Sequence, residues 1–193
     1  IGHGRVLTAT LVDAGLRTLR LGGGRLGIQR SRIIWRGGGR LIRWWINFAS
    51  VEQLSDKCVF ITVFEVVNTG FYGTEMSKKE KTIATNRLLE QCGIEYVKER
   101  MFSDVSAGEQ QKAWLAFALA QSKDLIIMDE PLSSVDLSSR ESFYDLLRKI
   151  NNNGKTLIVV THDLDMAIKY SDKIICLNKG NKIFEGEPSA FPK

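Results

Sequence analysis

Polar capping residues followed by apolar residues at helical spacing recur three times after residue 70. In each case a serine precedes a glutamate by three positions, which is the capping-box pattern of helix starts. These patterns predict helices over residues 78–91, 107–121 and 139–150, and a shorter helix is predicted over 163–170. The capping pairs are Ser77 with Glu80, Ser106 with Glu109, and Ser138 with Glu141.

Short runs of apolar and β-branched residues alternate with these helices. The runs over residues 125–128, 156–160 and 173–177 predict buried strands, and a polar turn at 178–181 predicts a hairpin into 182–184. Continuous apolar strands are typical of parallel sheets that helices cover on both faces. The alternation therefore predicts an α/β fold.

Residues 1–47 differ in composition from the rest of the chain. They show no sustained helical or strand period and contain glycine triplets at 22–24 and 37–39. Nine arginines, no lysine and one acid give this segment a net charge of +8, whereas residues 48–193 carry −3. We interpret it as an anomalous segment, such as a frameshifted or mis-joined start, that is foreign to one domain over residues 48–193. The alternative is an Arg/Gly-rich arm that binds nucleic acid by neutralising phosphates.

The composition of the 193-residue chain is that of a globular protein, with 44% apolar and 25% charged residues. No stretch approaches the roughly 20 apolar residues that a membrane-spanning helix needs, and no secretion signal is recognisable. The cysteines are far apart and form no Cys-x-x-Cys pair, which argues against a disulfide framework or a zinc site. We therefore expect a soluble, reduced, cytoplasmic protein. The cysteines are Cys58, Cys92 and Cys176.

Charged and polar side chains follow two of the predicted strands. Asp129 and Glu130 come directly after residues 125–128, and His162 follows residues 156–160. Because ligands of open α/β sheets bind at the carboxyl ends of the strands, we expect these side chains at one edge of the sheet. One carboxylate can hold Mg²⁺ while the other orients an attacking water, and the histidine can sense a transferred phosphoryl group. The alternative for the acid pair is a pair of surface carboxylates that cap the next turn.

Four motifs, in order along the chain, resemble those of the ATP-binding subunits of ABC transporters. The signature motif has the consensus Leu-Ser-Gly-Gly-Gln, from which Ala107 and Glu109 depart. A serine N-cap with a glycine in the first turn leaves backbone N–H groups free at the positive end of a helix, which suits a phosphate. The motifs are Val105 to Glu109 for the signature, Leu125 to Glu130 for Walker B, Ser133 to Asp136 for the D-loop, and His162 for the switch histidine.

The resemblance implies a role for each matching residue. Glu130 would be the catalytic base, Asp129 would hold Mg²⁺, and His162 would steady the γ-phosphate of ATP. Gln53 resembles the Q-loop glutamine, which meets Mg²⁺ and signals to the membrane subunit, so it would be both a catalytic and a metal-binding residue. The residues that would contact the nucleotide, most of them across a head-to-tail dimer of two ATPase subunits, are Ser106, Ala107, Gly108, Glu109 and Asp136.

The resemblance also implies a P-loop NTPase-like α/β fold, in which helices flank a largely parallel sheet. An inserted helical signature subdomain would span about residues 70–122, and the catalytic core would span residues 48–69 and 123–187. The N-terminal part of the fold would be missing or replaced by residues 1–47.

The function implied by the resemblance is that of an ATP-binding and ATP-hydrolysing subunit, which couples hydrolysis to import of a metal ion or metal chelate. Residues 61–73 resemble the segment after the Q-loop in importers of metal ions, siderophores, haem or cobalamin. The implied partners are a transmembrane permease subunit and a second ATPase subunit, on the cytoplasmic face of the cell membrane. The implied cofactors are ATP and Mg²⁺.

The sequence lacks a recognisable phosphate loop (Walker A), which has the form Gly-x-x-x-x-Gly-Lys-[Ser/Thr]. The sequence Gly154-Lys155-Thr156 precedes a strand rather than a helix, and Lys149 stands where the first glycine belongs. Losing three charge-assisted contacts to phosphate would weaken nucleotide binding by about three decades. The alternative function is therefore a non-catalytic relic of such a subunit, without ATP hydrolysis.

Overall fold

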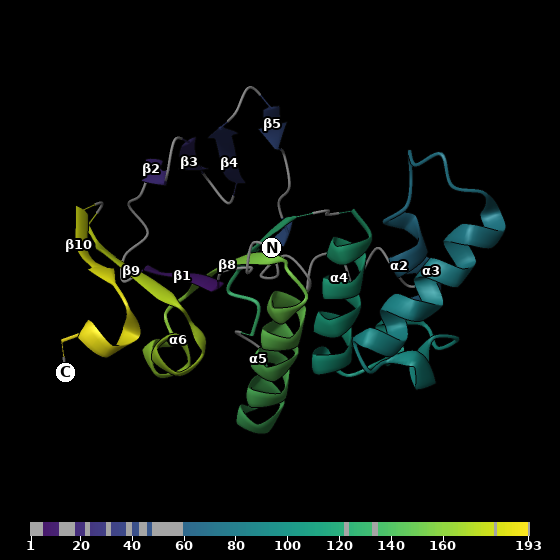
Figure 1. The fold of residues 1–193 in the computed structure, drawn as a ribbon. Coiled ribbons are helices and arrows are strands. Elements are labelled where there is room, and N and C mark those ends of the chain that lie inside the picture. The colour runs from purple at the N-terminus through teal and green to yellow at the C-terminus, as the bar shows by residue number, and fades with distance from the viewer. Residues whose placement is uncertain are drawn as a thin grey trace. The chain divides into compact units, whose positions relative to one another are not determined.

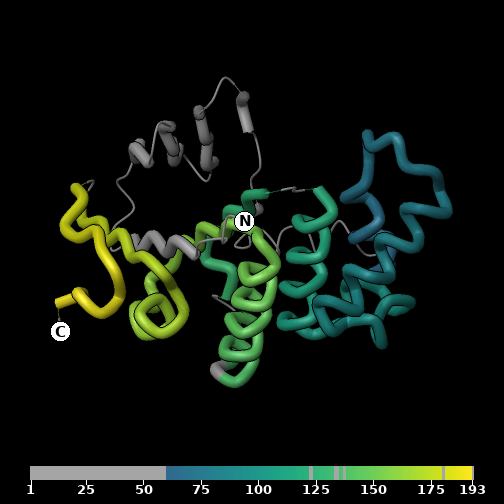
Figure 2. The backbone as a smooth tube through the Cα atoms, in the orientation of Figure 1, coloured from purple at the N-terminus to yellow at the C-terminus, as the bar shows by residue number. Residues whose placement is uncertain are grey.

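The computed structural model describes residues 60–121, 124–132, 135–179 and 181–192, apart from the side chain of Leu137 (Figure 2). Within residues 1–47 it describes the backbone of six strands. The chain divides into two compact units. The first contains Ile1–Asn47, Leu125–Pro131 and Leu147–Lys193, and the second contains Phe48–Asp124 and Leu132–Leu146.

A six-stranded sheet is the centre of the first unit (Figure 1). Its strands lie in the order β10-β9-β1-β8-β7-β6, and all neighbours are parallel except the antiparallel pair β9 and β10. The predicted α/β fold with a largely parallel sheet is confirmed. The strands are β1 Val6–Leu11, β6 Ile46–Asn47, β7 Leu125–Asp129, β8 Thr156–Thr161, β9 Lys173–Asn178 and β10 Asn181–Gly186.

The register of β7 and β8 brings their carboxyl ends to the same edge of the sheet. Asp129 at the end of β7 is paired with Val160 near the end of β8. The middle of β7 is buried, and β8 is buried from Leu157 to its end. Strands buried in this way are rich in Ile, Val and Leu, which is why the sequence shows them as apolar runs without alternation. Polar residues that follow these strands therefore meet at one edge.

Strands also form within residues 1–47, where the sequence shows no regular period. Strands β1 and β6 join the six-stranded sheet, and four others form a separate antiparallel sheet in the order β2-β3-β4-β5. Strand β2 pairs with β3, and β4 pairs with β5, each in antiparallel register. The four strands are β2 Thr18–Leu21, β3 Gly24–Gln29, β4 Arg32–Gly37 and β5 Arg40–Ile42.

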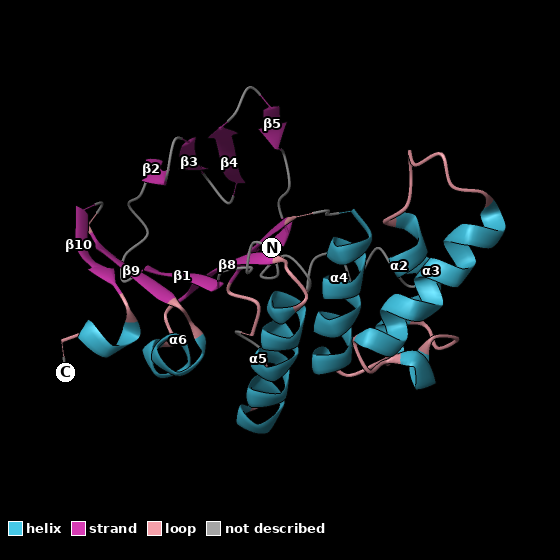
Figure 3. Ribbon diagram, viewed as in Figure 1, coloured by secondary structure: helices cyan, strands magenta, loops and turns pink. Residues whose placement is uncertain are grey.

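Helices dominate the second unit (Figure 3). Helices α2, α3 and α4 pack against one another, and the unit also holds the first part of α5. Among the helices that the structure describes, none has the length and hydropathy to span a membrane. The helices are α2 Val63–Thr69, α3 Lys78–Gln91, α4 Ala107–Gln121, α5 Leu137–Asn152 and, in the first unit, α6 Leu164–Tyr170; short 3-10 turns span Glu95–Val97, Phe102–Asp104 and Pro188–Ala190.

Capping residues begin the helices as predicted in two of three cases. Ser77 caps α3 and Ser106 caps α4, each with the glutamate three positions later. The predicted start of α5 after Ser138 is wrong, because the helix begins at Leu137. Asp136 is its N-cap: its Oδ1 accepts a hydrogen bond of 3.0 Å from the Ser139 N–H. A carboxylate is a stronger acceptor than a hydroxyl at a helix start, where the backbone N–H groups carry partial positive charge.

Gly70, at the end of α2, lies against α4 without space for a side chain. A Cβ at this position would lie 2.7 Å from Ala120 Cβ and 2.8 Å from the Phe117 carbonyl oxygen. We expect Gly70→Ala to lower the free energy of unfolding by about 2 kcal/mol, because overpacking forces backbone shifts. Urea denaturation followed by circular dichroism measures this change. Adding Ala120→Gly should recover only part of the loss, because the Phe117 carbonyl remains; full recovery, or no loss in Gly70→Ala, would contradict the packing.

Candidate active site

Glu130 follows β7 in an uncommon backbone conformation. Its φ is 45°, in the left-handed region that residues other than glycine rarely adopt. The Glu130 N–H donates a hydrogen bond of 2.8 Å to the Val160 carbonyl of β8. This bond holds the turn against the neighbouring strand, so that the strained residue has a defined position.

His162 follows β8 and contacts the Glu130 side chain. The distance from His162 Nδ1 to Glu130 Oε1 is 2.8 Å. The histidine side chain is 72% exposed, whereas that of Glu130 is 28% exposed. Next along the chain, Asp163 caps α6 by accepting a hydrogen bond of 3.1 Å from the Met166 N–H. The sequence places the two side chains at one edge of the sheet, and the structure brings them into hydrogen-bond contact.

Asp129 is half-buried beside this pair. Burial raises the pKa of the Asp129 carboxyl, and the negative charge of Glu130 raises it further. A bound cation would offset both effects, because it favours the charged carboxylate. The described residues contain no group of three or more His, Cys, Asp or Glu side chains that could enclose a metal ion. Mg²⁺ is a cation that proteins often hold through one or two carboxylates together with water and substrate phosphates.

The signature residues lie in the second unit, at the start of α4. Ser106 is the N-cap, and its N–H and Oγ are 2.7 Å and 2.6 Å from Glu109 Oε2. Ala107 is the first residue of the helix and is exposed. A Cβ on Gly108 would lie 3.8 Å from Ser139 at the start of α5, so the first turns of the two helices are close. The signature therefore lies beside the helix that the D-loop residues precede.

Asp136 is the described polar residue of the D-loop, whose Ser133 and Ser134 lie outside the described residues. Hydrogen bonds from Ser138 and Ser139 lower the pKa of the Asp136 carboxyl well below its usual range. The side chain is therefore charged and engaged at the N-terminus of α5. Gln53, predicted as both a catalytic and a metal-binding residue, lies outside the described residues.

Tyr96 contacts the signature but is absent from the predicted set. Its hydroxyl donates a hydrogen bond of 2.7 Å to Glu109 Oε1. The two residues are 13 positions apart and belong to different elements, so no periodicity relates them. A family motif does not include Tyr96 either, which is why only the structure identifies it.

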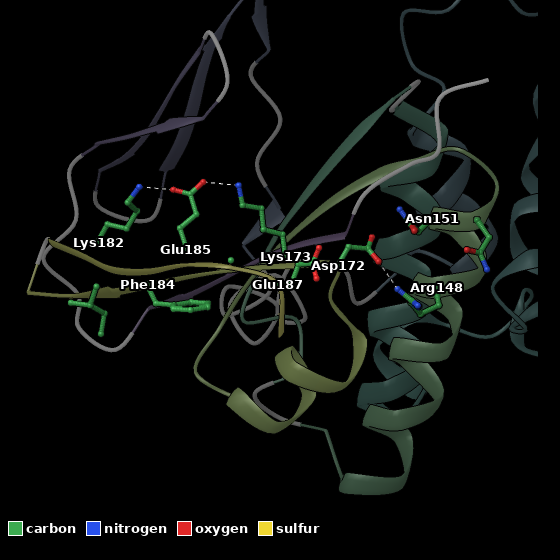
Figure 4. A pocket seen from close by; sticks show the side chains of 11 residues that line it. Arg148, Asn151, Asp172, Lys173, Lys182, Phe184, Glu185 and Glu187 are labelled. Carbon is green, nitrogen blue, oxygen red and sulfur yellow. Dashed lines mark hydrogen bonds and ion pairs between the residues drawn. The ribbon is translucent and has the colours of Figure 1, made fainter. Parts of the chain in front are cut away.

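A hollow of about 1020 Å³ lies in the first unit, and neither Glu130 nor His162 is among its lining residues (Figure 4). Lys173 and Lys182 both point toward Glu185 in this hollow, at 2.6 Å and 2.5 Å from its carboxylate oxygens. Hydrogen bonds from the two lysines lower the pKa of Glu185 to about 2. Exposed ion pairs of this kind contribute little to stability. Both lysines are paired with the same carboxylate, and this hollow contains none of the strand-end residues.

Comparison with known proteins relates the chain to one family. Residues 40–133 match the family model described as ABC transporter. The achromobactin transport ATP-binding protein CbrD of Dickeya dadantii is 32% identical over 149 residues, which are 74% of this chain and 55% of that protein. The manganese transport system ATP-binding protein MntB of Listeria innocua is 37% identical over 146 residues, or 72% of this chain and 60% of that protein. The chain thus spans a little over half the length of these relatives.

Solved structures of ATP-binding cassettes share the fold. CbiO1 of Clostridium perfringens, part of the ABC transporter complex CbiONQ, gives a TM-score of 0.72 at 22% identity, over 98% of this chain and 79% of that chain. The cassette MJ0796, in a dimeric post-hydrolysis state with ADP and Pi, gives 0.68 at 20% identity, over 99% of this chain and 88% of that chain. The expected P-loop NTPase-like fold is confirmed. Through residues 40–133 and the relatives named above, the chain resembles the ATP-binding subunits of the ABC transporter family.

Proposed function

We propose that the chain binds and hydrolyses ATP as the ATP-binding subunit of a transporter. The observation that carries the proposal is the contact of 2.8 Å between His162 and Glu130, at the sheet edge where Asp129 also ends its strand. A carboxylate that a histidine holds in place, beside a second carboxylate, is an arrangement suited to phosphoryl transfer to water.

Each of the three residues has a distinct part in the proposed reaction. Glu130 accepts a hydrogen bond from the attacking water and takes up its proton. A His162 ring protonated on both nitrogens donates from Nδ1 to Glu130 and from Nε2 to a γ-phosphate oxygen. Asp129 would hold Mg²⁺, which, when bound, would neutralise charge on the phosphate oxygens. Gln53 would meet the same ion.

The second unit would serve a neighbouring ATPase subunit. Ser106 and Gly108 present the N-terminus of α4, and anions bind favourably at such helix ends. Ala107, Glu109 and Asp136 would border the same nucleotide. The proposed assembly is a head-to-tail pair of subunits in which each signature faces the ATP of the other. Its support is that the cassette MJ0796, which shares this fold, forms a dimer in a state with ADP and Pi.

The transported substrate we propose is a metal ion or a metal chelate. Its support is the naming of relatives for manganese and achromobactin transport. A permease subunit would carry the cargo across the membrane, and this chain would bind to its cytoplasmic side. The support comes only from the names of the relatives, because the proposed site would bind ATP rather than the cargo.

A non-catalytic chain is the second candidate, because the sequence contains no Gly-x-x-x-x-Gly-Lys-[Ser/Thr] motif. Calorimetric titration of the full chain with Mg-ATP separates the two functions. The proposed function predicts a Kd for Mg-ATP below about 10 µM. Asp129→Asn should weaken the Mg²⁺-dependent part of this binding. Glu185→Gln, which alters a carboxylate outside the site, should leave the binding unchanged. A Kd in the millimolar range would favour the non-catalytic chain.

A further inference from the structure

Tyr96 contacts the carboxylate oxygen of Glu109 that Ser106 does not contact. The tyrosine lies in the 3-10 turn Glu95–Val97 and is 74% exposed, yet its hydroxyl approaches Glu109 Oε1 at 2.7 Å. An ionised carboxylate only accepts hydrogen bonds, so the tyrosine is the donor. Hydrogen bonds to charged acceptors are stronger than neutral ones. The contact fixes one oxygen of Glu109 and leaves the other toward Ser106.

The second oxygen of Glu109 accepts a hydrogen bond from the Ser106 hydroxyl. Glu109 Oε2 lies 2.7 Å from the Ser106 N–H and 2.6 Å from Ser106 Oγ. A serine hydroxyl carries one proton, which it donates here to the carboxylate. The same hydroxyl oxygen lies 3.4 Å from the Glu109 N–H, as in a capping box. Ser106 therefore has no further proton to give to a phosphate oxygen in this arrangement.

The charge of Glu109 also affects a hollow of about 340 Å³ beside the signature. Its lining includes Ser106 and Gly108 from the start of α4, and Lys112 is the cation and Glu109 the acid among the residues that border it. Anions bind at helix starts through free N–H groups and the positive end of the helix dipole. A carboxylate in this place opposes the binding of a phosphate.

Glu109 is charged at neutral pH. Burial opposes its ionisation, but hydrogen bonds from Ser106 and Tyr96 and the positive charge of Arg100 lower the pKa of the Glu109 carboxyl below its usual value. Arg100 itself is held by a hydrogen bond of 2.7 Å to the Asp104 carbonyl oxygen. The groups that face Glu109 are therefore Tyr96, Arg100 and Ser106, with Lys112 along the hollow.

We propose that Tyr96 is a positioning residue of the signature, which keeps Glu109 bonded to Ser106 and so withholds the serine hydroxyl from phosphoryl groups. Binding of a phosphoryl group then requires the bond between Ser106 and Glu109 to open. The proposal rests on the proposed role of the signature in nucleotide binding. It adds a regulatory step to that role, set by a residue outside the motif.

Nuclear magnetic resonance of the full chain tests the positioning role without nucleotide. The amide signal of Ser106 should follow the titration of Glu109, because the carboxylate accepts its N–H. Tyr96→Phe should raise the midpoint of this titration and reduce its amplitude, since the charged carboxylate loses a donor and becomes less ordered. Tyr72→Phe, at a tyrosine that is 93% exposed in the same unit, is the control and should change neither. An unchanged midpoint in Tyr96→Phe would overturn the proposal, even if its melting temperature fell.

Binding of inorganic phosphate tests whether Glu109 keeps the Ser106 hydroxyl from phosphoryl groups. In Glu109→Gln, the phosphate concentration that half-saturates the shifts of the Ser106 and Gly108 amides should fall about fivefold, because a competing unit charge is removed. Tyr96→Phe should give a smaller decrease, and Tyr72→Phe none. Equal midpoints in all variants would overturn the proposal.

These measurements are independent of the strand-end site. Failure of the proposed function would appear as weak Mg-ATP binding with the effects of Tyr96→Phe and Glu109→Gln intact. Failure of the positioning role would appear as unchanged Ser106 signals in a chain that binds Mg-ATP.

Discussion

Glu130→Gln is expected to lower the rate of ATP hydrolysis by the full chain at least about a hundredfold, with little change in the affinity for Mg-ATP. A positioned general base contributes about a hundredfold or more to a rate, and an amide cannot take up the proton of the attacking water. The amide still accepts a hydrogen bond from His162, so the geometry of the turn at φ 45° should persist. Steady-state phosphate release and calorimetry together measure rate and binding.

The matched control is Glu185→Gln, which removes a carboxylate from the same unit but outside the site. Its rate of hydrolysis should equal that of the unaltered chain. His162→Ala should lower the rate as well, since Glu130 would lose the side chain that holds it. An unaltered rate in Glu130→Gln, or an equal loss in Glu185→Gln, would remove the catalytic role of Glu130; absence of hydrolysis in the unaltered chain would favour the non-catalytic candidate.

The strand-end residues could be predicted from the sequence because their common position follows from the parallel direction of the two strands. Parallel strands present their carboxyl ends on one edge. Placing Asp129, Glu130 and His162 together therefore required only that the two apolar runs before them be identified as strands. The left-handed conformation of Glu130 could not be predicted, because it depends on the bond to the Val160 carbonyl across the sheet. The contact of Tyr96 with Glu109 depends in the same way on tertiary packing.

Helix starts were predictable where the capping residues were local, and less so where two candidates competed. Ser77 and Ser106 cap as their spacing indicates, but the carboxylate of Asp136 takes the place predicted for Ser138. The start of α2 was not predicted, although Thr62 and Glu65 form a complete capping box. The apolar run around this helix resembles a strand as much as a helix, and short runs cannot be assigned by period alone.

The position of β1 between β8 and β9 is the largest difference from the sequence-based interpretation of residues 1–47. Parallel pairing of β1 with both neighbours joins residues far apart in the chain. Local sequence carries little information on such non-local pairing, since it depends on which edges are open in the rest of the sheet.

Phe102→Ala is expected to lower the free energy of unfolding by about 4 kcal/mol, because it leaves a cavity in the second unit. The Phe102 side chain is fully buried, and its ring lies edge-on to Trp114, with 5.5 Å between centroids. Its carbonyl oxygen also accepts a hydrogen bond of 3.0 Å from the Gln110 side chain, directly after the signature. Urea denaturation followed by far-ultraviolet circular dichroism measures the loss.

Two further variants separate packing from the general effect of losing an aromatic ring. Phe60→Ala removes a ring that is 92% exposed in the same unit and should change stability by no more than about 0.5 kcal/mol. Phe102→Leu fills most of the cavity and should cost about 1.5 kcal/mol or less. Because the segment before Ser106 packs through Phe102, the alanine variant should also shift the Ser106 amide signal, whereas the leucine variant should retain it. Equal stability of Phe102→Ala and Phe60→Ala would show that this ring does not anchor the signature.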